Sequence, residues 1–78
     1  MVIGFILVTT STSMEKAAVK ALSKIPEVQE VHLLFGEYDI LLKVEAKDMD
    51  DLGKIVIKKI RTKKGVIDTE TLSGMDYY

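Results

Sequence analysis

The residues best suited to chemistry in this chain form a short polar break between two apolar runs: Gly36, Glu37, Tyr38 and Asp39. Gly36 can adopt a positive φ, so it permits a tight two-residue hairpin turn and lets another molecule approach the bare backbone. Such a turn requires glycine and polar residues, but it requires neither an aromatic ring nor a carboxylate after that ring. We therefore interpret Tyr38 and Asp39 as parts of a candidate binding site, with an ordinary hairpin turn and a local Asp39 hydrogen bond as the simpler alternatives.

The composition limits both the fold and its surroundings. The 78 residues make one domain, residues 1–78, and a domain of this size needs an additional stabilising element. Cysteine is absent, which excludes disulfides and the usual zinc sites and fits a reducing cytoplasm, so oligomerisation remains as that element. Eleven basic and twelve acidic residues leave a net charge of −1, which argues against direct nucleic-acid binding. The apolar run at residues 2–8 is too short to span a membrane.

The hydrophobic periodicity predicts four strands and two helices. Thr12 and Glu15 have the spacing of a capping box, which predicts the start of the first helix, and Pro26 ends that helix. Asp48 is the predicted cap of the second helix, and Gly65 its end. Residues 74–78 form a C-terminal tail. Strands rich in β-branched and apolar residues are expected at residues 2–9, 28–35, 38–45 and 66–73.

Both predicted helices are amphipathic, with apolar residues three or four positions apart. A row of lysines on the first helix, Lys16, Lys20 and Lys24, is expected to face solvent. The apolar faces consist of Met14, Ala18, Ala21, Leu22 and Ile25 in the first helix, and of Leu52, Ile55, Val56 and Ile60 in the second.

The resulting order, β-α-β-β-α-β, is the ferredoxin-like arrangement, an α+β sandwich with a four-stranded antiparallel sheet. Right-handed crossovers place both helices on the same face of the sheet. The expected central strands, residues 2–9 and 38–45, are apolar at both alternations, so the helices cover only half of their side chains. We therefore predict a homodimer that packs sheet face to sheet face, with a ligand or an RNA base on the bare face as the alternative.

Three stretches carry a resemblance to a known family. They are residues 25–31, with the sequence IPEVQEV, residues 36–44, with GEYDILLKV, and residues 65–71, with GVIDTET. In this order they resemble the ligand-sensing (RAM) module of the Lrp/AsnC family of transcription regulators. The resemblance covers residues 2–73, nearly the whole chain.

The resemblance implies an oligomeric, effector-binding module. Modules of this family form sheet-face dimers that assemble into rings, often octamers, and bind small effectors, typically amino acids, in clefts between dimers. Full-length regulators carry a DNA-binding helix-turn-helix domain before the module, whereas only Met1 precedes the first strand here. We therefore expect a cytoplasmic, non-enzymatic amino-acid sensor without a DNA-binding domain, which modulates related full-length regulators by mixed assembly or competes with them for effector.

The polar break suits such a ligand, because a free amino acid needs hydrogen-bond donors for its carboxylate and an acceptor for its ammonium group. Backbone N–H groups around Gly36 and Glu37 are the candidate donors, Asp39 is the candidate acceptor, and Tyr38 is a wall or a hydrogen-bond partner. By the resemblance, Thr69 and Thr71 match the family's closing Thr-x-Thr and add hydroxyl contacts from a nearby strand or another subunit. A polar edge strand is the simpler explanation of these two threonines.

Two other classes share the order of elements. ACT-like amino-acid regulatory modules bind ligand near the first strand-to-helix turn, here residues 9–13, which are rich in hydroxyls but lack the expected glycine. An RNA-recognition domain needs a basic-Gly-aromatic pattern on its third strand, where this chain has Tyr38, Asp39 and Ile40.

His32, the only histidine, leaves an enzyme alternative open. Dimeric ferredoxin-like barrels include monooxygenases, some with a haem held by one histidine. A single strand histidine is more often packed or half-exposed, and no metal-ligand set, nucleophile–base pair or glycine-rich phosphate loop accompanies this one. We therefore expect no enzyme, no metal and no cofactor.

Overall fold

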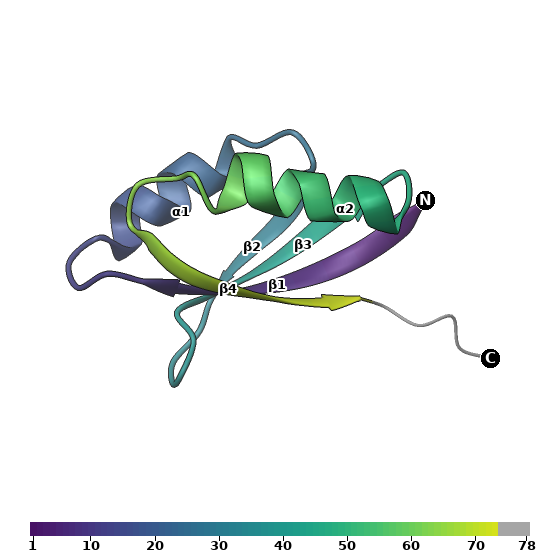
Figure 1. Ribbon diagram of the computed structural model, residues 1–78. Helices are drawn as coiled ribbons and strands as arrows, with labels where there is room; N and C mark the ends of the chain where they lie inside the picture. The colour runs from purple at the N-terminus through teal and green to yellow at the C-terminus, as the bar shows by residue number, and fades with distance from the viewer. Residues whose placement is uncertain (74–78) are drawn as a thin grey trace.

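Both helices lie on one face of a four-stranded antiparallel sheet (Figure 1). The structure is a computed structural model that describes residues 1–73, so the predicted tail at 74–78 lies outside the described residues. The predicted β-α-β-β-α-β order is confirmed. Its elements are β1 (Val2–Thr10), α1 (Glu15–Ser23), β2 (Val28–Leu33), β3 (Ile40–Ala46), α2 (Met49–Ile55), which continues into a short π-helix η1 (Val56–Ile60), and β4 (Val66–Ser73).

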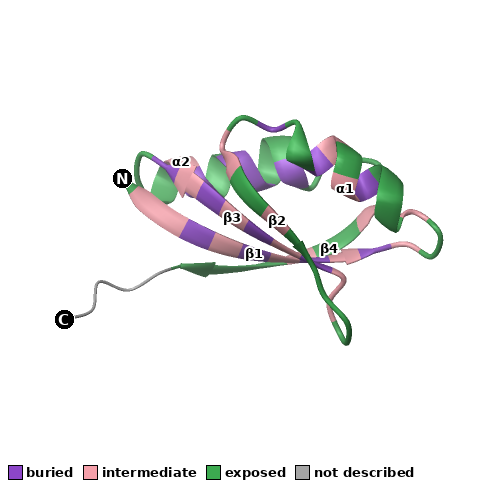
Figure 2. Ribbon diagram, turned by 180° about the vertical axis from the view of Figure 1, so that it is seen from behind, coloured by how far each residue is buried: buried purple, intermediate pink, exposed green. Residues whose placement is uncertain are grey.

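The strand order is β2-β3-β1-β4, so β1 and β3 are the central pair, as predicted. Val8 lies opposite Ile40, and Ile6 opposite Leu42, which places these four side chains on the helix-facing side of the sheet. Figure 2 shows buried bands alternating with intermediate bands along both central strands. The buried core consists of Ile6, Val8, Ala18, Leu22, Ile25, Ile40, Leu42, Val44, Ala46, Leu52, Ile55, Val56 and Ile60.

The other face of the sheet carries Ile3, Phe5 and Leu7 of β1, and Leu41 of β3, all half-buried. Leu72 lies beside Phe5 on β4 and is 46% exposed. No helix or strand of residues 1–73 covers these side chains, so the prediction of a bare apolar sheet face is confirmed.

The predicted capping box at the first helix is wrong. Met14 occupies the N-cap of α1, and no side chain there accepts a hydrogen bond from the helix. Ser13 has a φ of 73°, a left-handed conformation that turns the chain just before the helix and leaves Thr12 outside it. The apolar face is largely as predicted: Ala18, Leu22 and Ile25 are buried, although Met14 and Ala21 are only half-buried.

The second helix begins as predicted and ends earlier than predicted. The Asp48 carboxylate caps it by accepting a 2.8 Å hydrogen bond from the Asp51 N–H, and all four predicted core residues, Leu52, Ile55, Val56 and Ile60, are buried. The Arg61 N–H bonds to the Val56 carbonyl, five residues back, so the last turn widens into η1 and stops at Ile60 rather than at Gly65.

Candidate functional site

The polar break forms a hairpin that projects beyond the sheet on the side away from the helices (Figure 1). The Leu34 N–H donates a 2.9 Å hydrogen bond to the Asp39 carbonyl, which leaves four residues, 35–38, in the loop. The predicted two-residue turn is therefore wrong, and Tyr38 and Asp39 precede β3 rather than starting it. Gly36 does adopt the predicted positive φ, at 144°.

The Asp39 carboxylate ties this hairpin to the end of β1. Its Oδ2 accepts hydrogen bonds from the Thr10 N–H at 2.8 Å and from the Thr10 hydroxyl at 3.1 Å. The Asp39 N–H in turn donates to the Val8 carbonyl at 2.9 Å. The simpler reading, a local turn hydrogen bond, is thus replaced by a bond to a residue 29 positions earlier. Asp39 Oδ1 makes no hydrogen bond to the described residues.

Tyr38 connects the hairpin to β4, because its hydroxyl donates a 3.2 Å hydrogen bond to Glu70 Oε1. Partial desolvation and the nearby carboxylates, Glu70 and then Glu37, raise the pKa of the Tyr38 phenol above its usual value. The phenol therefore stays protonated around neutral pH and remains a hydrogen-bond donor.

Thr69 and Thr71, the two remaining predicted site residues, lie on the opposite face of β4 from Glu70. Thr69 pairs with Val8 and Thr71 with Ile6, both core residues, so the threonine side chains point to the helix-facing side. Thr69 is half-buried and Thr71 exposed. Within one chain, no described hydrogen bond joins either threonine to residues 36–39.

Gly36 and Glu37 stand exposed at the hairpin tip, and their backbone N–H groups donate to no residue within 1–73. The hairpin thus combines exposed amide donors at its tip with a carboxylate and a phenol at its base. Such a set can bind an anionic group at the amides and a cationic group at the carboxylate.

Sequence reasoning missed Thr10, the partner of Asp39. A signal was present: Thr10 continues the alternation of Ile6 and Val8, so the pattern places a polar side chain at a core-facing position. A polar group that is only 7% exposed requires a hydrogen-bond partner, and Asp39 supplies it.

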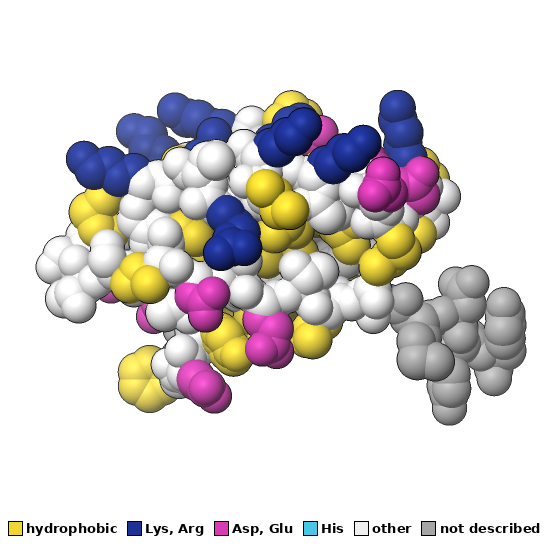
Figure 3. Space-filling view, in the orientation of Figure 1, with side chains coloured by type: hydrophobic (Ala, Val, Ile, Leu, Met, Phe, Trp, Pro, Cys, Tyr) yellow, Lys and Arg dark blue, Asp and Glu magenta, His cyan; other side chains and the backbone are white. Residues whose placement is uncertain are grey.

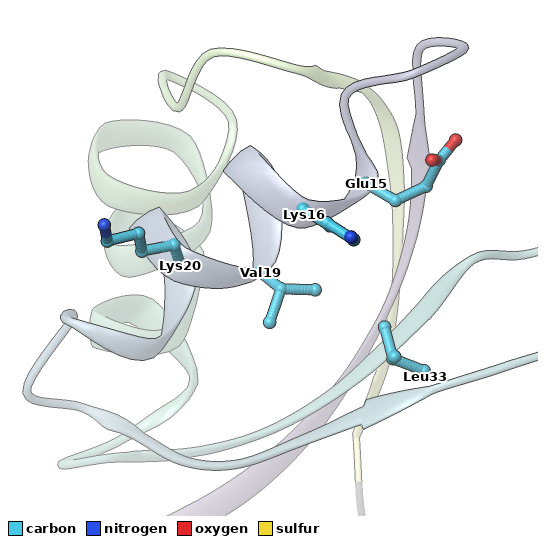
Figure 4. Close-up of a pocket in the computed structure, with 5 residues that line it drawn as sticks. All are labelled: Glu15, Lys16, Val19, Lys20 and Leu33. Carbon is cyan, nitrogen blue, oxygen red and sulfur yellow. The ribbon is translucent and has the colours of Figure 1, made fainter.

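A groove next to the hairpin was missed as well. Figure 4 shows Val19 of α1 facing Leu33 of β2 across an open space, with Lys16, Lys20 and Glu15 along its sides. Its volume is about 220 Å³.

The charged side chains are unevenly distributed. Figure 3 shows lysine and arginine side chains gathered over the helix layer, while acidic side chains lie at the hairpin, along β4 and at the start of α2. The predicted solvated row, Lys16, Lys20 and Lys24, is exposed as expected.

His32 lies on the bare sheet face, with its Nε2 2.8 Å from Glu30 Oε1 and about half of its side chain exposed. This hydrogen bond, with help from Lys43, lowers the pKa of the Glu30 carboxyl. His32 is therefore a half-exposed surface residue, one of the two ordinary environments expected for it. Residues 1–73 contain no group of three or more potential metal-ligating side chains, and no helix among them is long and apolar enough to cross a membrane.

The chain is thus a ferredoxin-like α+β domain with one bare sheet face and a polar hairpin that leads into its central strand β3. The model of the Lrp/AsnC ligand binding domain matches residues 3–76. The chain therefore belongs to the Lrp/AsnC family, and it corresponds to the ligand-binding domain of that family.

Relatives by sequence are of two kinds. An uncharacterized HTH-type transcriptional regulator of Pyrococcus furiosus is 50% identical over 58 residues, which cover 74% of this chain and 39% of the regulator. A homocitrate synthase of Sulfurisphaera tokodaii is 53% identical over 55 residues, which cover 70% of this chain but 12% of the enzyme. The chain therefore spans well under half the length of these relatives.

Solved structures agree with the family assignment. Escherichia coli AsnC superposes with a TM-score of 0.91 at 31% identity, over 97% of this chain and 52% of AsnC. A transcriptional regulator of Neisseria meningitidis, crystallised as a complex with L-Met, superposes with a TM-score of 0.82 at 26% identity, over 96% of this chain and 50% of that chain.

Proposed function

We propose that this chain is an oligomeric sensor module that binds a free amino acid and modulates transcription through related full-length regulators. The observation that carries the proposal is the match of residues 3–76 to the ligand-binding domain of the Lrp/AsnC family. The Neisseria relative was crystallised with L-Met, which supports an amino acid as the class of ligand.

The chemistry of the hairpin supports the same ligand class. The exposed amides of Gly36 and Glu37 are suited to a carboxylate, and Asp39 Oδ1 to an ammonium group. Asp39 Oδ2 holds Thr10, so the carboxylate is fixed in place before a ligand arrives, which lowers the ordering cost of binding. The Tyr38 phenol is a neutral donor on the β4 side of the hairpin.

The pattern of relatives supports effector binding rather than DNA binding or catalysis as the property of this segment. The matched segment occurs in HTH-type regulators and also as a small part of a homocitrate synthase. Neither DNA binding nor catalysis is an activity that both kinds of protein share. A ligand-sensing role explains the occurrence in both, because a regulatory domain can control either DNA binding or an enzyme.

We propose a sheet-face homodimer in the cytoplasm, assembled further into a ring such as an octamer. The bare apolar face supports the dimer, because Phe5 and Leu7 would otherwise stay in contact with water. Thr69 and Thr71, which point away from their own hairpin, then serve the site of a neighbouring subunit. Mixed assembly with full-length relatives would bring the sensor to DNA without direct nucleic-acid contact.

Thermal denaturation with each standard amino acid tests the proposal. A ligand at 100 times its Kd stabilises the folded state by about 2.7 kcal/mol, which raises the melting temperature by roughly 10 to 20 °C in a domain of this size. The shift should fall in Asp39→Asn and in Thr71→Val, and stay unchanged in Thr12→Val, a matched substitution in the β1–α1 loop. Stabilisation by haem or a quinone, with no response to any amino acid, would contradict the sensor function.

A further inference from the structure

The hairpin tip carries a large apolar side chain, Phe35, that is not buried within the described part of its own chain. Phe35 is fully exposed. Burying it against another molecule would remove a large apolar surface from water. The tip points away from the helix layer (Figures 1 and 2). Two hydrogen bonds hold it there, one from the Leu34 N–H to the Asp39 carbonyl and one from the Thr10 N–H to the Asp39 carboxylate.

The groove between α1 and β2 is an unfilled apolar site in the same molecule. Val19 and Leu33 form opposite walls, and the hydrocarbon parts of Lys16 and Lys20 complete the lining (Figure 4). The groove lies where β2 ends at Leu33 and the chain turns away into the hairpin, next to the first turns of α1. Its volume of about 220 Å³ is smaller than a typical small-molecule pocket, and it suits a single large side chain.

We infer that the groove between α1 and β2 receives the hairpin tip of a second copy of this chain, with Phe35 as the inserted side chain. The tip cannot reach the groove of its own chain, because the two lie on opposite sides of the sheet. Each copy has one hairpin tip and one such groove, so an assembly of identical copies contains equal numbers of tips and grooves.

Charge complementarity favours a second copy as the occupant. Glu37 lies two residues from Phe35 on the exposed tip, and Lys16 and Lys20 border the groove. Neither lysine forms an ion pair within residues 1–73, and only Glu15 offsets them along the groove. Insertion of Phe35 would therefore bring a carboxylate towards two cationic side chains, which adds specificity and register to an apolar contact.

The inference specifies a contact within the oligomer of the proposed function, and it requires no effector. Because the tip and the groove are different surfaces, a copy that inserts its tip into one neighbour can receive the tip of another, as in a closed ring. The contact also places the Gly36–Asp39 turn beside α1 of the neighbouring subunit.

Disulfide cross-linking tests the contact directly, because the chain has no native cysteine. A Glu37→Cys variant is mixed with a Lys16→Cys variant, without any amino acid ligand, and oxidised. We expect a cross-linked dimer in at least about fivefold excess over the mixture of Glu37→Cys with Lys58→Cys, a matched lysine at the exposed surface of η1. Adding Phe35→Ser to the Glu37→Cys chain should abolish this excess, since loss of a buried phenyl group weakens association about 10- to 100-fold.

Three outcomes would overturn the inference: equal cross-linking of Glu37→Cys to the Lys16→Cys and Lys58→Cys variants, preferential cross-linking of Glu37→Cys to itself, or an excess that persists after Phe35→Ser. Circular dichroism of each variant separates these outcomes from misfolding, and Lys20→Cys serves in place of Lys16→Cys if that variant fails to fold. Amino-acid binding with no excess cross-link would refute the contact and leave the sensor function intact.

Discussion

Replacing Asp39 by alanine should destabilise the protein even when no effector is present. Thr10 is only 7% exposed, and its backbone N–H donates a 2.8 Å hydrogen bond to the Asp39 carboxylate. Asp39→Ala removes the acceptor and leaves this N–H buried without a partner, at a cost of about 1 to 3 kcal/mol. The second bond, from the Thr10 hydroxyl at 3.1 Å, adds less, because a hydroxyl can rotate towards another acceptor.

The corresponding change in melting temperature is large for so small a domain. At about 4 to 8 °C per kcal/mol, a loss of about 2 kcal/mol lowers the melting temperature by roughly 8 to 16 °C. Asp39→Asn keeps an oxygen acceptor for the Thr10 N–H and loses only the charge, so it should cost about half as much. The variants are compared by circular dichroism melts at equal protein concentration, since oligomerisation makes the melting temperature depend on concentration.

A surface carboxylate provides the matched control. Asp50 is 86% exposed and, within residues 1–73, pairs only with Lys54, so Asp50→Ala should change the stability by at most about 0.5 kcal/mol. An Asp39→Ala protein that melts as high as Asp50→Ala would refute the assignment of Asp39 to the support of Thr10. An effector response that is lost in Asp39→Asn, at a temperature where this variant is still fully folded, would separate a role in binding from this structural role.

Three further predictions concern other parts of the molecule. Phe5→Glu puts a charge in the centre of the bare sheet face, so it should convert the proposed sheet-face dimer to monomers, as measured by light scattering, while Ile57→Glu on the exposed surface of η1 should not. The hydrogen bond from Lys59 at 2.5 Å lowers the pKa of the Glu27 carboxyl below its usual value. Glu27→Gln should therefore cost about 0.5 to 1 kcal/mol at neutral pH, and urea titrations should show this difference vanish as the pH falls through the lowered pKa. Gly53→Ala should stabilise α2 by about 0.5 to 1 kcal/mol, because a Cβ at this position meets nothing within 4 Å. Gly65→Ala should instead destabilise the protein, because Gly65 has a φ of 94° and its Cβ would lie 3.0 Å from Met14 Cβ.

The overall fold followed from the sequence because local periodicity and connectivity agree. Leu52, Ile55, Val56 and Ile60 recur at helical spacing and are all buried in the structure. The double-sided apolar pattern of β1 and β3 indicated central strands with one uncovered face, and the sheet order agrees. Neither inference needed a contact between residues distant in sequence, beyond the handedness of the crossovers.

The details of the site depend on contacts that local patterns do not report. The hairpin is longer than predicted because the Leu34–Asp39 bond closes it and Asp39 is drawn to Thr10, 29 residues earlier. The capping box failed because Ser13 adopts a left-handed conformation that its sequence neighbours do not require. The helix-facing orientation of Thr69 and Thr71 depends on their register with β1, which the alternation within β4 alone leaves undetermined.

Asp39 links the two proposals for the hairpin. Its Oδ2 fixes the hairpin to β1, and the same hairpin carries Gly36 and Phe35. An ammonium group held at Oδ1 would restrict the carboxylate further, and so restrict the tip that is inferred to enter the groove of a neighbouring copy. By thermodynamic reciprocity, an effector that strengthens assembly must bind more tightly to the assembled form by the same factor. A site formed by the Asp39 hairpin and a neighbour's Thr71 would therefore couple the amino-acid concentration to the extent of oligomerisation.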